Sequence, residues 1–227
     1  MPKTKTTAPQ TVELIFPQDP LSLGYNLYAD DHIYLRPGIT TLVGCNGAGK
    51  TTLMRQLMYT IKKQRENAVI VQFNNLTDGG HNAIEEALFL QQNNLGANLL
   101  IASEGESIRL NVGQFMKKAG AKMSQTKDAK ELWIFLDATD SGLSIDNAVE
   151  IKDAMRFIIE TEGKRGIDVF AILSTNSYEF ARNETCIYVY HPSKTITFKD
   201  YEDYRSFILK SSETRQSLYD KKKTDKT

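Results

Sequence analysis

A short glycine-rich segment, Gly44 to Thr51, has residue types that suit the binding of phosphate groups. It reads GCNGAGKT and matches the pattern G-x-x-x-x-G-K-[ST]. Glycines let backbone N–H groups converge on phosphate oxygens, while Lys50 neutralises the β- and γ-phosphates and the Thr51 hydroxyl is a ligand for Mg²⁺. The segment therefore predicts a site for ATP and Mg²⁺, lined by Asn46, Gly47, Ala48, Gly49, Lys50, Thr51 and Thr52.

A second segment places a carboxylate where it could hold the metal. Leu132 to Asp137 reads LWIFLD, the apolar run of a buried strand that ends in an acid. An aspartate in this context holds Mg²⁺ through water in phosphate-loop proteins. We therefore expect Asp137 to join Thr51 at the metal site, although an acid after a strand is weak evidence by itself.

The elements that must position these residues follow an alternating order along the chain. Four short apolar runs are typical of strands buried on both faces of a parallel sheet, and helical patterns follow the first and third of them. This alternation predicts an α/β fold with right-handed crossovers. The expected strands are Ile39–Gly44, Ala68–Phe73, Leu132–Asp137 and Asp168–Ser174, and the expected helices are Thr51–Arg65 and Ile145–Glu162.

The remaining segments complete one domain. Thr185–Tyr190 and Lys194–Phe198 flank a turn and predict a hairpin, and a closing helix is expected from about Tyr201 to Tyr219. Residues 1–11 lack periodicity and are expected to be disordered, residues 12–210 to form the nucleotide-binding domain, and residues 211–227 to be a charged tail.

Charge, cysteine spacing and hydropathy limit the partners and the locations that we expect for this chain. The 28 basic and 28 acidic residues cancel, so no global charge draws the chain to nucleic acid or to an anionic membrane, although a local basic patch is still open. The two cysteines have no metal-ligand spacing. No apolar run is long enough for a membrane helix, and the first residues lack a secretory signal. We expect a soluble, cytoplasmic protein without membrane insertion.

Four segments together resemble the motifs of the ATP-binding-cassette (ABC) ATPases, in that family's order. GCNGAGKTT at Gly44 to Thr52 resembles GxNGAGKST, and LDATDSGLS at Leu136 to Ser144 resembles LDEPTSGLD. ASEGESIR at Ala102 to Arg109 looks like the signature LSGGQxxR, and Ile172 to Ser177 is similar to the switch segment. The resemblance implies a phosphate-loop NTPase fold, with a mostly parallel, ABC-like sheet flanked by helices.

The resemblance also implies a homodimer and further site residues. In the family, the signature of one subunit closes over the nucleotide of the other, so Ser103 and the N–H of Gly105 would face the partner's γ-phosphate. The same residues also fit an ordinary helix start, with Ser103 as N-cap and Glu106 in the capping-box position.

Two further roles that the family implies have several candidates each. The aromatic residue that stacks on adenine would be Tyr25, with Tyr28 and Tyr34 nearby, and any of the three could be core instead. The loop that senses Mg²⁺ and the γ-phosphate offers Gln72, Asn74 and Asn75, which strand alternation does not separate. We include Asn75 in the expected metal site.

Three substitutions depart from the family pattern and bear on turnover. Ala138 replaces the glutamate that polarises the attacking water, Asn176 replaces the switch histidine, and Glu104 replaces a signature glycine. Losing a positioned general base costs about 10²- to 10⁴-fold in rate, while the groups that bind ATP survive. Asp140 could take over the orientation of water, or Ala138 could be an engineered change that traps ATP. We keep Lys50, Asp137, Asp140 and Asn176 as the candidate catalytic residues.

The spacing between motifs favours a stand-alone protein. The stretch from Lys50 to Ser103 is too short for the helical lobe with which transporter subunits hold a membrane partner, and no heptad run lies within it. The chain thus looks like the small ATP-binding proteins of bacteria and phages. The leading hypothesis is an ABC-type ATPase that dimerises around Mg-ATP and acts on an unidentified protein or nucleic acid, with DNA metabolism as a candidate process. The alternative is a hydrolysis-deficient ATP sensor, and a transporter's cytosolic subunit is less favoured.

Overall fold

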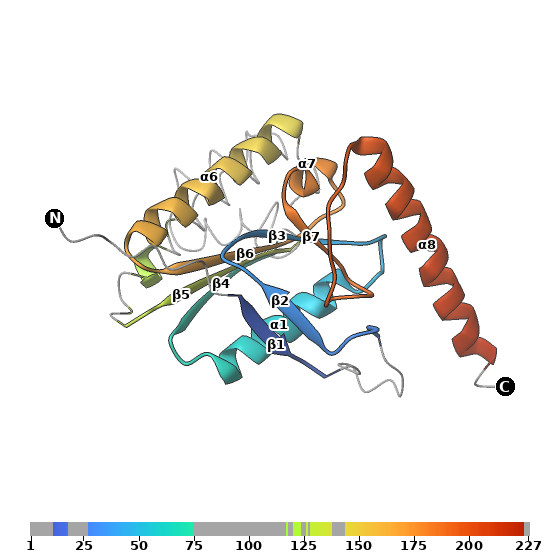
Figure 1. Cartoon of the computed structure of the whole chain (residues 1–227), viewed down its shortest axis with the longest axis horizontal. Coiled ribbons are helices and arrows are strands. Elements are labelled where there is room, and N and C mark those ends of the chain that lie inside the picture. The colour runs from blue at the N-terminus through green and yellow to red at the C-terminus, as the bar shows by residue number, and fades with distance from the viewer. Residues whose placement is uncertain are drawn as a thin grey trace, which may run out of the picture.

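The computed structural model describes residues 11–17, 27–74, 117, 120–123, 126, 128–137 and 144–224. These residues form a twisted sheet with helices on both of its faces, shown as the coloured ribbon in Figure 1. Within them, no helix is both long and apolar enough to cross a membrane.

Six strands make up the central sheet, in the spatial order β4-β5-β6-β3-β7-β8. The first five run parallel to their neighbours, and β8 is antiparallel to β7. The chain therefore has the expected α/β fold with a mostly parallel sheet. The strands are β3 (Gly38–Val43), β4 (Ala68–Asn74), β5 (Glu131–Asp137), β6 (Asp168–Ser174), β7 (Thr185–Tyr188) and β8 (Thr195–Ile196).

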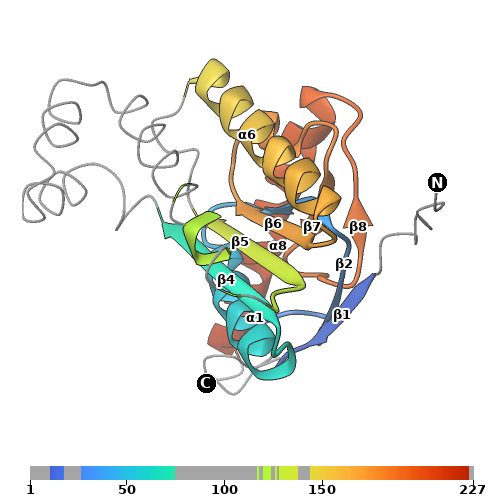
Figure 2. The same ribbon diagram turned by 90° about the vertical axis from the view of Figure 1, so that its left-hand side faces the viewer.

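Alternation along the strands divides the apolar side chains between two cores. On β5, Trp133 and Phe135 join the core beneath α1 (Lys50–Gln64), whereas Ile134 joins the core beneath α6 (Ile145–Lys164). Figures 1 and 2 show α6 and α1 on opposite faces of the sheet. Because both faces are covered, the inner strands are almost continuously apolar, which is the pattern that predicted them.

A two-stranded antiparallel ribbon was not among the expected elements. It consists of β1 (Val12–Ile15) and β2 (His32–Leu35), with Leu14 opposite Ile33. Alternate residues of both strands are buried in the core that also holds α1. The ribbon therefore covers part of the sheet face on which the phosphate loop opens into α1.

The C-terminal part of the chain contains the expected hairpin and a longer helix than expected. The short helix α7 (Tyr178–Ala181) precedes the β7–β8 hairpin, whose strands pair at Cys186 and Ile196. The closing helix α8 runs over Tyr201–Thr224.

Helix α8 extends into the expected charged tail at residues 211–227. The helix passes residue 210 without interruption, and Ser211 is buried against the domain. No glycine or proline occurs between Tyr201 and Thr224, and the charged residues in this stretch are good helix formers. A charged composition was therefore compatible with helix. The helix continues past its expected end near Tyr219 to Thr224, and the division into domain and tail at residue 210 stays a prediction.

The core at the centre of the sheet provides a test of the fold. Phe170 on β6 is 1% exposed and stacks on Trp133 with ring centroids 4.0 Å apart, whereas Phe157 on α6 is 69% exposed. Phe170→Ala should lower the free energy of unfolding by about 3–5 kcal/mol, while Phe157→Ala should change it by less than about 0.5 kcal/mol. Urea unfolding of both variants measures the difference, and equal losses would contradict the assigned core.

Candidate nucleotide-binding site

The parallel register of the sheet brings several sequence-predicted residues to one edge. Asp137 at the end of β5 lies opposite Ser174 at the end of β6, and Ser174 in turn lies opposite Leu42 of β3. Segments that leave the carboxyl ends of these strands therefore meet. At this edge of the sheet lie the glycine-rich loop after β3, the Asp137 side chain at the end of β5, and Asn176 just beyond β6.

The loop after β3 has a backbone that depends on glycine at two positions. Gly47 has a φ of 76° and Gly49 a φ of 98°, both in the left-handed region that side chains with a Cβ avoid. Gly49 is the N-cap of α1, which begins at Lys50. The loop thus leads directly into a helix N-terminus, where unpaired N–H groups and the helix dipole favour an anion.

Lys50 folds back over this loop. Its ammonium group donates hydrogen bonds to the carbonyl oxygens of Gly44 (2.7 Å) and Cys45 (3.2 Å), and to Oδ1 of Asn176 (2.8 Å). Lys50 is only 9% exposed. These three oxygens belong to neutral groups, and phosphate oxygens with a full negative charge would form stronger hydrogen bonds with the ammonium group.

Thr51, which follows Lys50 in the chain, and Asp137, which ends β5, supply a pair of oxygen ligands. The Thr51 hydroxyl donates a hydrogen bond to Oδ1 of Asp137 over 3.1 Å. Asp137 is 4% exposed at the end of its strand. A hydroxyl and a carboxylate are the hard oxygen ligands that Mg²⁺ prefers, and a protein typically provides only one or two of them beside phosphate groups. These residues therefore fit a Mg²⁺ ion bound together with a nucleotide.

These groups line one cavity with a volume of about 340 Å³. Its volume falls in the usual range of ligand sites. The lining contains every predicted loop residue, the predicted Asp137 and Asn176, and Ser174, which reasoning from the sequence had not singled out. The lining residues are Asn46, Gly47, Ala48, Gly49, Lys50, Thr51, Thr52, Asp137, Ser174 and Asn176.

Several predicted site residues lie outside the part of the chain that the structure describes. They are Tyr25, Asn75, Ser103, Gly105 and Asp140, and with them Glu104 and Ala138. Their roles in adenine stacking, metal sensing, the subunit interface and water orientation stay predictions.

The two other tyrosines considered for adenine stacking occupy different environments. Tyr28 is 2% exposed and packs edge-on against Phe16 with ring centroids 5.6 Å apart, and its burial raises the pKa of its hydroxyl. It is a core residue. Tyr34 is 43% exposed on β2, and a hydrogen bond with Glu13 raises its pKa.

Helix α8 contributes two contacts to the loop that no sequence pattern indicated. The backbone N–H of Cys45 donates a hydrogen bond to Oγ of Ser211, and Arg215 donates one to the carbonyl oxygen of Asn46. Ser211 fell at the start of the expected tail, so nothing in the sequence connected it with the loop.

Part of the chain is similar to a known protein family. Residues 34–76, which hold the end of β2, β3, the loop, α1 and β4, match the family model of the type IV secretion-system coupling protein DNA-binding domain. No curated protein matches the sequence.

Among solved structures, the likeness is to proteins at low identity. Stu0660 of Streptococcus thermophilus is 12% identical with a TM-score of 0.47, and the match covers 84% of this chain and 77% of that one. A nucleotide-free ATP-binding cassette from an ABC transporter is 13% identical with a TM-score of 0.47, over 89% and 99%. The ADP conformation of MJ1267, an ATP-binding cassette of an ABC transporter, is 14% identical with a TM-score of 0.45, over 91% and 99%. The nucleotide site itself rests on the geometry of this chain.

Proposed function

We propose that this chain binds ATP together with Mg²⁺ and acts as an ATPase or an ATP-dependent switch. The observation that carries the proposal is the convergence of Lys50, Thr51 and Asp137 on one cavity beside the glycine-rich loop. Mg²⁺ bound there would neutralise charge on the phosphate oxygens.

Each of these residues has a distinct task in binding. Backbone N–H groups of the loop and of the first turn of α1 point toward the phosphates, and they need no side chain to do so. Lys50 exchanges its carbonyl partners for phosphate oxygens, which releases Asn176 to contact the nucleotide. Thr51 and Asp137 hold the metal from the opposite side.

The assembly that we propose is a homodimer closed by ATP. Its support is the resemblance of residues 102–109 to the ABC signature, by which Ser103 and Gly105 would complete the partner's site. The match of residues 34–76 to the model of a DNA-binding domain favours a partner in nucleic-acid metabolism. A protein of this kind would act in the cytoplasm on that macromolecule.

A second candidate is an ATP sensor that hydrolyses slowly or not at all. Ala138 stands where the family has its catalytic glutamate, and Asn176 accepts a hydrogen bond from Lys50 where the family has a histidine. ATP would then be a structural ligand whose binding, rather than its turnover, changes the protein. The short stretch between Lys50 and Ser103 keeps a transporter subunit the least favoured candidate.

Lys50→Ala tests the loop directly. Removing the ammonium group takes away the main fixed charge that faces the triphosphate, so the Kd for Mg-ATP should rise at least about tenfold, equivalent to about 1.4 kcal/mol. Calorimetric titration measures the Kd, with Lys62→Ala on the exposed side of α1 as the control. Binding within about twofold of the parent by the Lys50 variant would show that the loop is not the triphosphate site.

Asp137→Asn separates the metal from the nucleotide. The amide keeps the shape of the side chain but loses its negative charge, so the gain in ATP affinity that Mg²⁺ provides should shrink, while binding in EDTA changes little. Titrations with and without Mg²⁺ give the two affinities. Asp153→Asn on the exposed face of α6 should leave both unchanged. Equal losses in the two titrations would contradict a metal role for Asp137.

ATP-dependent dimerisation and slow turnover form the next prediction. Light scattering should find dimers with Mg-ATP and monomers with ADP or without nucleotide, because each nucleotide adds contacts only in the dimer. Ser103→Arg should prevent dimerisation without changing ATP binding by one protomer.

Ala138→Glu should raise phosphate release by about 10²- to 10⁴-fold, since it restores a positioned base, and it should shorten the lifetime of the dimer. A chain that stays monomeric in saturating Mg-ATP would overturn the shared site. Fast hydrolysis by the unaltered chain would instead indicate that Asp140 or another group replaces the glutamate.

A further inference from the structure

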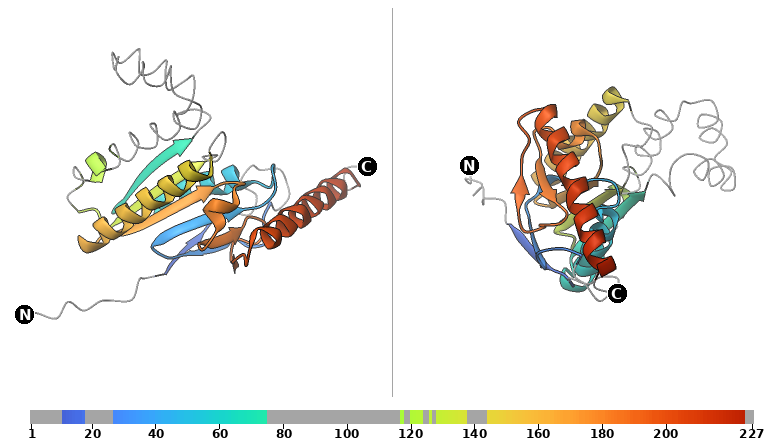
Figure 3. Two further views of the ribbon diagram at one scale, coloured as in Figure 1. Left: turned by 90° about the horizontal axis from the view of Figure 1, so that it is seen from above. Right: turned by 90° about the vertical axis from the view of Figure 1, so that its right-hand side faces the viewer.

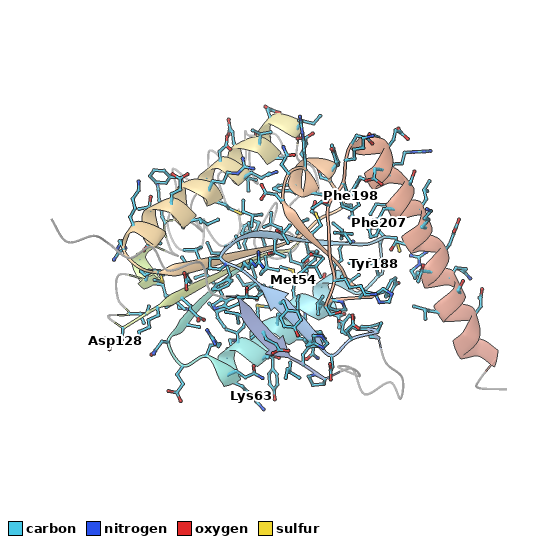
Figure 4. The ribbon with its side chains drawn as sticks, viewed as in Figure 1. Met54, Lys63, Asp128, Tyr188, Phe198 and Phe207 are labelled. Atoms are coloured by element: carbon cyan, nitrogen blue, oxygen red, sulfur yellow. The ribbon has the colours of Figure 1, made fainter. Side chains whose placement is uncertain are left out.

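Helix α8 is fixed to the domain by an aromatic cluster at the β7–β8 hairpin. Phe207 packs edge-on against Tyr188 with ring centroids 4.8 Å apart, and Tyr204 packs edge-on against Phe198 at 5.0 Å. Figure 4 shows Tyr188, Phe198 and Phe207 gathered between the hairpin and the first half of the helix. The position of the following turn of α8 is therefore set by the core.

That following turn lies on the glycine-rich loop. Ser211 is 2% exposed, and its Oγ accepts a hydrogen bond of 3.0 Å from the N–H of Cys45. Arg215, four residues later on the same face of the helix, donates to the carbonyl oxygen of Asn46. Its Nη1 stands only 3.3 Å from the point where a Cβ on Gly47 would lie, so a larger residue at Gly47 would press on the guanidinium.

These contacts come from the side of the loop that faces away from the nucleotide. Neither Ser211 nor Arg215 lines the cavity, whereas Asn46 and Gly47 do. The peptide groups at Cys45 and Asn46 are held by α8, and within the loop the Ala48 N–H donates to the carbonyl oxygen of Cys45 over 3.1 Å. The loop is thus fixed between a helix on one side and the nucleotide site on the other.

We propose that α8 is a clamp on the phosphate loop, in which Ser211 and Arg215 are positioning residues that hold Cys45 to Gly47 ready for the triphosphate. The proposal rests on the assignment of the cavity as a nucleotide site. A loop that is already ordered loses less conformational freedom when the ligand binds, so the clamp increases affinity. By linkage, bound ATP must strengthen the docking of α8 by the same factor.

The clamp gives the C-terminal helix a regulatory role. Beyond Ser212, the described side chains of α8 are exposed, and the helix extends past the strands of the sheet (Figures 1 and 3). Any change that pulls α8 from the hairpin would loosen the loop and lower ATP affinity. Conversely, nucleotide binding at the loop would change how firmly α8 is docked, and a partner that contacts the helix could respond to that change.

Two substitutions test the clamp, each with a matched control on the same helix. Ser211→Ala removes the acceptor of the Cys45 N–H without any change of charge, and Arg215→Ala removes the donor to Asn46. Each should raise the Kd for Mg-ATP by about five- to tenfold in calorimetric titrations, because a loop amide or carbonyl loses its partner. Ser206→Ala and Arg205→Ala, at exposed positions one to two turns earlier, should stay within about twofold.

The neutral Ser211 variant distinguishes positioning from attraction between charges. If Arg215 acted on the triphosphate only as a distant charge, Ser211→Ala would have no effect, and the effect of Arg215→Ala would disappear at 1 M salt. If both residues position the loop, both losses persist at high salt. The first pair of results overturns the clamp, and the second supports it.

Modification of Cys45 gives a readout that does not depend on nucleotide binding. Cys45 and Cys186 are both free and buried. Cys45 and Tyr190 belong to the buried cluster against which Ile208 of α8 packs. Burial, followed by Cys45 and Tyr188, raises the pKa of Tyr190 to about 12, and Arg215 acts in the opposite direction. Undocking of α8 should therefore expose the Cys45 thiol.

Peptide-mapped alkylation should find Cys45 at least about fivefold more reactive in the double variant Ser211→Ala/Arg215→Ala than in the parent. Mg-ATP should slow the reaction in both proteins, since docking and binding favour each other. Cys186 packs in the cluster that holds Tyr204 of α8, so it reports whether the first half of the helix stays docked, and its reactivity should not change. Increased reactivity at both cysteines would indicate release of the whole helix or general unfolding, and would contradict a local clamp at Ser211 and Arg215. Unchanged Cys45 reactivity would also overturn the clamp.

Failure of the clamp and failure of the nucleotide site give different results. If the parent binds Mg-ATP and Lys50→Ala does not, but the Ser211 and Arg215 variants bind like the parent, the clamp is wrong and the site is correct. If the parent does not bind ATP, the site is wrong, and the alkylation rates without nucleotide still decide whether α8 holds the loop.

Discussion

The alignment of strand ends in the parallel sheet is the constraint on which the site depends. Asp137, Ser174 and Leu42 occupy neighbouring positions across β5, β6 and β3, so the loop after β3 opens beside the carboxylate that ends β5. A shift of one residue in the register would turn the Asp137 side chain to the other face of the sheet and break its hydrogen bond with Thr51. The two apolar cores prevent that shift, because it would also exchange Trp133 and Ile134 between faces.

The buried charge of Lys50 shows how the same loop can be stable before it binds anything. Carbonyl oxygens of Gly44 and Cys45 and the amide oxygen of Asn176 compensate for the desolvation of the ammonium group. Phosphate oxygens carry a full charge and form stronger hydrogen bonds with a cation. These three neutral oxygens therefore stabilise the loop and are weaker partners than phosphate oxygens would be, and Asn176 is the one among them that lies outside the loop, just beyond β6.

Sequence patterns predicted the elements that are buried on both faces, and they failed where an element's role is set by tertiary contact. The strands β3, β4, β5 and β6, the helices α1 and α6 and the hairpin were expected, because continuous apolar runs and a period of 3.6 reflect burial directly. The ribbon of β1 and β2 was missed because only alternate residues of its four-residue strands are buried, so neither strand shows a continuous apolar run. Most residues that line the cavity were predicted from one local motif. Ser174 was not, because strand pairing rather than a motif brings it to the cavity.

The docking of α8 on the loop illustrates what a local motif leaves out. The glycine pattern specifies the face that meets the phosphates, but it says nothing of what supports the opposite face. Ser211 is 166 residues from Cys45 in the chain, and no periodicity relates the two. The composition of residues 211–227 indicated a tail because charge was considered without the aromatic anchors Tyr204 and Phe207 that precede it. Once those anchors fix the first half of the helix, its rigidity carries Ser211 and Arg215 onto the loop. A loop supported in this way from the C-terminal helix can respond to events at that helix without any change in the residues that line the cavity.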